Sequence, residues 1–164
     1  MSAPWKRRSS KGGVSEAAHR AVVLLETTFP PADHAPLERL RLFFVARARL
    51  AAEHFGIPHL VFSEQFGKAL PPKGARALRS VVLRTREFLV EALEEAGARG
   101  EVRRDVPAEE LAAIAMGSMV ARALLTSVAG DEAGPPPDAS AAWDSLLTLL
   151  RPAAPPPDPS LVRG

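Results

Sequence analysis

The chain has 164 residues, a formal net charge of +2 at pH 7 and no cysteine or tyrosine, and only 5% of its residues are aromatic. A chain of this length is expected to form one domain whose core is built mainly from Ala, Leu and Val, which favours helices over a β-sandwich. The lack of cysteine excludes disulfides, thiolate zinc sites and cysteine nucleophiles.

The positive charge is concentrated at the N-terminus. Residues 1–13 contain four basic residues and no acidic residue, so they contribute +4 and leave about −2 for the rest of the chain. We interpret residues 1–14 as a disordered basic head. The alternative is that its basic residues contact the phosphates of a nucleic acid or a membrane. No apolar run approaches the ~20 residues of a membrane span and no signal-peptide pattern opens the chain, so we expect a cytoplasmic protein with no membrane partner.

Apolar residues recur at the three- and four-residue spacing of a helix face through the middle of the chain. Ser15 is the expected N-cap of the first helix, and Pro36 suits the first turn of the second because its missing N–H needs no partner there. Asp138 or Ser140 is expected to cap the last helix. We therefore predict an all-α fold with about six helices, at residues 15–29, 36–55, 59–66, 75–96, 108–128 and 139–150.

The stretch 97–130 organises this prediction. One helix is expected to end at Gly97 and Gly100, and the next to begin at Pro107 with Asp105 as its N-cap. That second helix is apolar over most of its circumference. We expect it to be buried on more than one side, against its own domain and against another chain or a ligand. Residues 152–164 are rich in proline and are expected to form a disordered tail.

Four pieces of the chain stand out together: PLERLRLFF at 36–44, HFGIPHLVFSEQF at 54–66, GARGEVRRDVPAEELA at 97–112, and Trp143 with Leu146, Leu147 and Leu150. In this order and spacing they resemble the C-terminal, ligand-binding and dimerisation domain of TetR/AcrR-type transcriptional regulators. The resemblance covers residues 15–151. It implies a TetR-like helical bundle with a two-helix dimerisation face.

Members of that family open with a three-helix DNA-binding domain that contains a helix-turn-helix. Only about 14 residues precede the first predicted helix, which is too few for three helices, and residues 22–25 resemble the helix that links the two domains. The resemblance thus implies the effector-sensing half of a transcription regulator, such as a repressor. It would bind DNA only if a longer product or a partner supplied the helix-turn-helix. The alternative is a stand-alone small-molecule-binding or heterodimerising protein that does not bind DNA itself.

A site for a small apolar or aromatic effector is expected where large apolar residues of several helices converge. Arg47 interrupts an apolar helix face, and an arginine is seldom buried without a partner or an anion. Each residue can equally belong to the core, and Arg47 can instead pair with Glu38 or Glu64 or reach the surface. The candidates are Phe43, Phe44, Arg47, Phe62, Phe66, Val82, Arg86, Met116 and Met119, together with Phe88.

A homodimer is expected through the helices at 108–128 and 139–150, with two helices from each chain forming a four-helix bundle about a twofold axis. Small residues would permit close approach, and large ones would supply contact area. The alternative is that these faces pack only within the chain. The candidate interface residues are Ala115, Ser118, Val120, Ala123, Leu124, Trp143, Leu146, Leu147 and Leu150.

No catalytic constellation is recognisable in the sequence. Ser63 lacks the glycines of a nucleophile elbow. The histidines form no close ligand pair. His54 and His59 flank a break in the helical pattern, and the alternative is that these two residues form a metal site. We therefore expect no enzyme, no metal and no cofactor.

Overall fold

The computed structural model describes residues 11–54, 56–62, 68–129 and 138–154. Within these ranges there are six helices and no strand, so the all-α prediction is confirmed. Over the same ranges, no helix combines the length and the apolar character needed to cross a membrane. The helices are α1 (Lys11–Glu26), α2 (Pro36–Glu53), α3 (Gly56–Phe62), α5 (Pro72–Ala98), α6 (Ala108–Ala129) and α7 (Ala139–Leu150).

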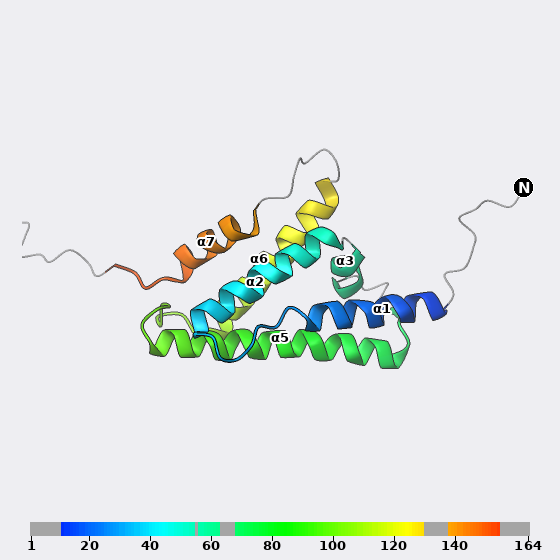
Figure 1. Cartoon of the computed structure of the whole chain (residues 1–164), viewed down its shortest axis with the longest axis horizontal. Coiled ribbons are helices and arrows are strands. Elements are labelled where there is room, and N and C mark those ends of the chain that lie inside the picture. The colour runs from blue at the N-terminus through cyan, green and yellow to red at the C-terminus, as the bar shows by residue number, and fades with distance from the viewer. Residues whose placement is uncertain (1–10, 55, 63–67, 130–137, 155–164) are drawn as a thin grey trace, which may run out of the picture.

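The longest helix, α5, has 27 residues and contacts α1, α2 and α6 (Figure 1). α1 lies along the N-terminal half of α5, and α2 crosses its C-terminal half. α7 packs on α2, on the side away from α5, and α3 contacts α6. Helices α1, α2, α3, α5 and α6 thus surround a common space.

Two clusters of buried apolar side chains hold the helices together. The larger cluster joins α2, α5, α6 and α7; it contains Phe43, which is fully buried, and Phe44, whose ring centre lies 5.9 Å from that of Trp143. The smaller cluster joins α1 to the N-terminal half of α5 and includes Leu50 near the end of α2. Because α2 contributes to both clusters, they meet along this helix.

The turn after α5 has the form expected of a Schellman C-cap. Gly100 has a φ of +73°, its N–H donates to the carbonyl of Gly97 at 3.0 Å, and the N–H of Glu101 donates to Ala96 at 2.9 Å. The prediction that a helix ends here is confirmed. The turn is then attached to α7, because the N–H of Arg103 donates to the carbonyl of Leu150 at 2.8 Å.

Two predicted N-caps are wrong. α1 begins at Lys11, so Ser15 lies inside the helix and residues 11–14 do not belong to a disordered head. In the added turn, Val14 packs against the smaller cluster. Asp105 does not cap α6; its two carboxylate oxygens accept from Arg103 at 2.8 and 2.6 Å, a bidentate charge-assisted pair. The predicted cap of α7 is confirmed, since Asp138 accepts from the N–H of Ser140 at 3.1 Å.

Candidate functional site

A cavity of about 100 Å³, partly open to solvent, lies where the two apolar clusters meet. An engineered apolar cavity of about 150 Å³ binds benzene, so this smaller and partly open space would hold at most a small ring or a short chain. Its wall is apolar except at Arg47 and Thr85. The lining residues come from α1 (Leu25), α2 (Phe43, Arg47, Leu50, Ala51), α3 (Ile57, Pro58, Val61), α5 (Val81, Val82, Thr85) and α6 (Met116, Met119, Val120, Ala123).

Five residues that the sequence suggested for a ligand site lie together in this wall: Phe43, Arg47, Val82, Met116 and Met119. Phe43 and Arg47 are one helical turn apart on α2, and the two methionines are three residues apart on α6, so each pair faces the same way. That these residues bind a ligand remains a prediction.

The other suggested ligand residues are elsewhere. Phe44 follows Phe43 by about 100° around α2 and faces Trp143, in the larger cluster. Arg86 is exposed on α5, and Phe88 packs beside Phe43, with ring centres 4.8 Å apart. The side chain of Phe62, and Phe66 as a whole, lie outside the described part of the chain.

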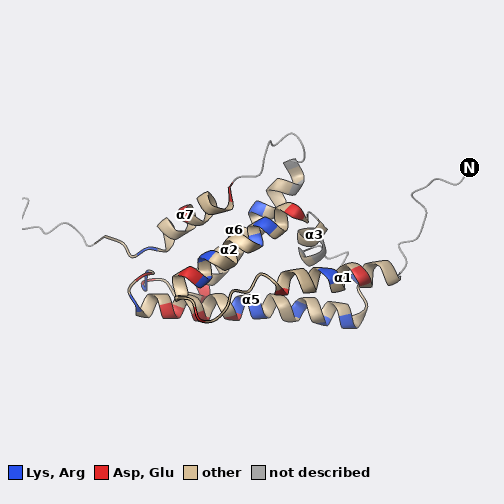
Figure 2. Ribbon diagram, in the orientation of Figure 1, with Lys and Arg blue, Asp and Glu red and all other residues tan. Residues whose placement is uncertain are grey.

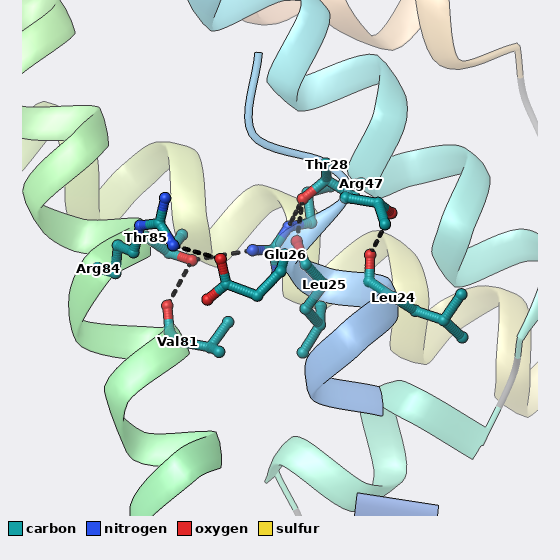
Figure 3. A network of polar contacts seen from close by, with 9 residues as sticks. Leu24, Leu25, Glu26, Thr28, Arg47, Val81, Arg84 and Thr85 are labelled. Atoms are coloured by element: carbon teal, nitrogen blue, oxygen red, sulfur yellow. Dashed lines mark hydrogen bonds and ion pairs between the residues drawn. The ribbon is translucent and has the colours of Figure 1, made fainter. Parts of the chain in front are cut away.

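Arg47 is held in place by two threonines (Figure 3). Its Nε–H donates to Oγ1 of Thr28 at 2.7 Å, and its Nη2–H donates to Oγ1 of Thr85 at 3.0 Å. The hydroxyl of Thr28 donates to the carbonyl of Leu25 at 2.6 Å, and that of Thr85 to the carbonyl of Val81 at 2.8 Å. Because each hydroxyl uses its own proton in this way, its oxygen is left to accept from the guanidinium.

Aromatic rings also surround this guanidinium. The Cζ atom of Arg47 lies 4.9 Å from the ring centre of Phe43 and 5.5 Å from that of Phe29. Phe29 packs against both Phe43 and Phe88, with ring centres 5.2 and 5.6 Å apart. The rings favour a cation at this position through their negative faces. Arg84 lies over Phe29 as well, with its Cζ 4.5 Å from the ring centre.

No ion pair of Arg47 is formed with any residue that the structure describes. The suggested partner Glu38 is bound by Arg41, through contacts of 2.8 and 2.7 Å, and Glu64 lies outside the described ranges. Glu26 pairs with Arg84. Burial lowers the pKa of Arg47 from its ordinary value to about 10, although the negative charge of Glu26 raises it. Arg47 therefore remains charged at neutral pH, in the wall of an apolar cavity.

The suggested dimer residues lie mostly inside the single chain. Ala115, Trp143, Leu146 and Leu150 are buried in the larger cluster, and Leu147 packs against it. These residues leave little area for a partner. Two further members of that set, Val120 and Ala123, line the cavity, while Ser118 and Leu124 are half-buried.

The exposed large apolar residues of α6 and of α7 are different ones. Ile114, Leu125 and Val128 on α6 are 52%, 69% and 83% exposed, and Leu149 on α7 is 66% exposed. The sequence pattern does not single them out, because α6 is apolar on nearly every side. The spacing of apolar residues therefore does not show which side of α6 is buried.

The sequence analysis also missed Thr28, Phe29 and Thr85, which position Arg47. Thr28 and Phe29 follow the end of α1, and Thr85 resembles any helical threonine that bonds the carbonyl four residues earlier. No signal in the sequence pairs them with Arg47. The side chain of His59 is not described, and within the described ranges no group of three acidic or histidine residues is placed to hold a metal.

The chain matches no protein-family model, and it shows no significant similarity to any curated protein or solved structure compared with it. Its function is therefore inferred from the cavity, its surroundings and the sequence.

Proposed function

We propose that this chain is the effector-sensing and dimerisation part of a TetR-type transcriptional regulator. A small apolar molecule bound in the cavity would modulate DNA binding by a helix-turn-helix that a longer product or a partner supplies. The observation that carries the proposal is the apolar cavity between five helices, with Arg47 fixed in its wall. The order and spacing of the sequence pieces that resemble this family support it further.

The contacts of the cavity give a route by which a ligand would act on α1. Leu25 of α1 lines the cavity, and Arg47 donates to Thr28, just beyond the end of that helix. Glu26 of α1 pairs with Arg84 of α5. A ligand that displaced Arg47 or pressed on Leu25 would shift α1 against α5. In the family that the sequence resembles, the helix at this position leads to the DNA-binding domain.

In this proposal a second copy of the chain covers the exposed face of α6 and α7. Ile114, Leu125 and Leu149 give it apolar area, and Gly117 and Ala121 permit close approach on α6. α7 carries a single charged residue, Asp144, while the outer side of α5 carries many charges (Figure 2). Apolar patches of this kind often mark a contact between chains, and a twofold axis would let the patch meet its own copy.

The proposal is tested by two measurements on the full chain. Size-exclusion chromatography with light scattering should give a dimer. Gel-shift assays at physiological salt should give no sequence-dependent DNA binding by the chain alone. Operator binding that depends on sequence would overturn the assignment of DNA reading to another segment. A monomer at all concentrations would overturn the dimer.

The exposed face of α6 and α7 also favours a second candidate function. The chain would pair with a related regulator through this face and prevent that regulator from binding DNA. Mixing the chain with such a regulator should then give heterodimers. If only homodimers form, this candidate is excluded.

A further inference from the structure

We propose that the effector is a small apolar carboxylate whose acid group pairs with Arg47 and whose hydrocarbon part fills the cavity. This inference rests on the proposed function and names the chemical class of its effector. It follows from the charge, the free edge of the guanidinium and the size of the cavity.

Among the described residues, Arg47 has no carboxylate of its own: Glu26, whose negative charge raises the pKa of Arg47, is itself paired with Arg84. Its described hydrogen-bond partners are the neutral hydroxyls of Thr28 and Thr85, and its other neighbours are the rings of Phe29 and Phe43. Arg84, which also contacts Phe29, is paired with Glu26. A charge placed among apolar groups is unfavourable unless an opposite charge pairs with it. The lowered pKa of Arg47 reflects the same imbalance, which an anion would reverse.

The guanidinium also has an edge available for a carboxylate. The bonds to Thr28 and Thr85 use Nε and Nη2, which form one edge of the planar group. On the other edge, Nη1 has no hydrogen bond to any described residue. Two parallel N–H groups on one edge match the two oxygens of a carboxylate. An amide or an alcohol would bind this edge with one oxygen only and would leave the charge unmatched.

The remaining wall sets the size and polarity of the rest of the molecule. Leu25, Val81, Val120 and Met116 present only apolar atoms, around a space of about 100 Å³. This space is smaller than the apolar cavity of about 150 Å³ that holds benzene, so we expect a ligand no larger than a single small ring or a short chain. Since Arg47 is the only charged residue in the described wall, a single acid group is expected and a dianion is disfavoured.

The experiment uses hexanoate and its neutral analogue hexanamide, which have the same number of heavy atoms. The chain has three methionines, and two of them, Met116 and Met119, line the cavity. Labelling the methionine methyl groups with ¹³C therefore places two reporters in the site. Titration at pH 7 should move both methyl signals, and hexanoate should bind at least tenfold more tightly than hexanamide.

Variants assign the preference to Arg47. Arg47→Met should bind both compounds about equally, and Arg47→Lys should keep part of the preference. Arg86→Met removes an exposed arginine of α5 outside the cavity and should behave like the unsubstituted chain. If Arg47→Met does not fold, the comparison of the two compounds on the unsubstituted chain and on Arg47→Lys decides the question.

The outcomes separate this inference from the proposed function. If hexanoate and hexanamide bind the unsubstituted chain equally, or if Arg47→Met keeps the preference, the carboxylate assignment is wrong while the cavity remains a ligand site. If neither compound moves the signals of Met116 and Met119 at millimolar concentration, both the carboxylate assignment and the sensing role of this cavity are overturned.

Discussion

Filling the cavity from α6 should stabilise the protein and remove the proposed ligand site. Ala123 lines the cavity, and leucine at this position would place three more carbon atoms in a space of about 100 Å³. Enclosed empty apolar volume costs about 24 cal/mol per Å³, so filling this partly open cavity would be worth at most about 2.4 kcal/mol. A single leucine fills only part of the space and loses rotamer freedom, so we expect Ala123→Leu to raise the free energy of unfolding by about 1 kcal/mol.

The assay is urea unfolding followed by far-UV circular dichroism, with thermal unfolding as a second measurement. A gain of about 1 kcal/mol corresponds to a rise in Tm of about 2–4 °C for a protein of this size. Ala113→Leu is the matched control, because Ala113 is on the same helix but exposed and outside the cavity. Ala123→Leu should also weaken hexanoate binding at least tenfold. If it lowers stability, or changes it no more than Ala113→Leu does, the cavity is not free space of the kind described.

Three further changes test the dimer surface, the turn after α5 and the core. Leu125→Glu should shift the proposed dimer toward monomer in light scattering. Leu83→Glu, at a residue of α5 that is 52% exposed, should not; equal effects of the two substitutions would contradict the proposed dimer surface on α6. Gly100→Ala should lower the free energy of unfolding by about 1–2 kcal/mol because of its positive φ, although the site has room for the added Cβ. An unchanged or higher free energy of unfolding would refute this account of the turn. Phe44→Ala should cost about 3–5 kcal/mol in urea unfolding, since its ring is buried against α7, and a loss below ~1 kcal/mol would show that this contact is not formed.

Most helix positions were predictable because proline and glycine mark their ends. Pro36 stands at the start of α2, and Gly100 follows the end of α5. The exceptions are helices whose starts contain residues that usually break a helix. α3 begins at Gly56 rather than near His59, since Pro58 falls in its first turn, where a missing N–H costs little.

The candidate site was only partly predictable for a related reason. Phe43 and Arg47 stand one turn apart on α2, so the sequence alone places them on one face. Which side of α6 is buried was not predictable. Ala115 and Ile114 are both apolar, and only the neighbouring helices decide that Ala115 is the buried one. Nor do residues 28 and 85, which lie far apart in the sequence, indicate that both bond to one guanidinium.

The position of Arg47 is easier to explain by ligand binding than by stability. A partly buried cation with neutral partners is less favourable than an apolar side chain of similar length, which would extend the apolar wall around it. An anion that binds only the folded chain would offset this cost and would stabilise the fold by about 2.7 kcal/mol at a hundred times its Kd. The same charge that weakens the unliganded protein would therefore make its stability respond to the effector. The position of α1, which ends just before Thr28, would respond as well.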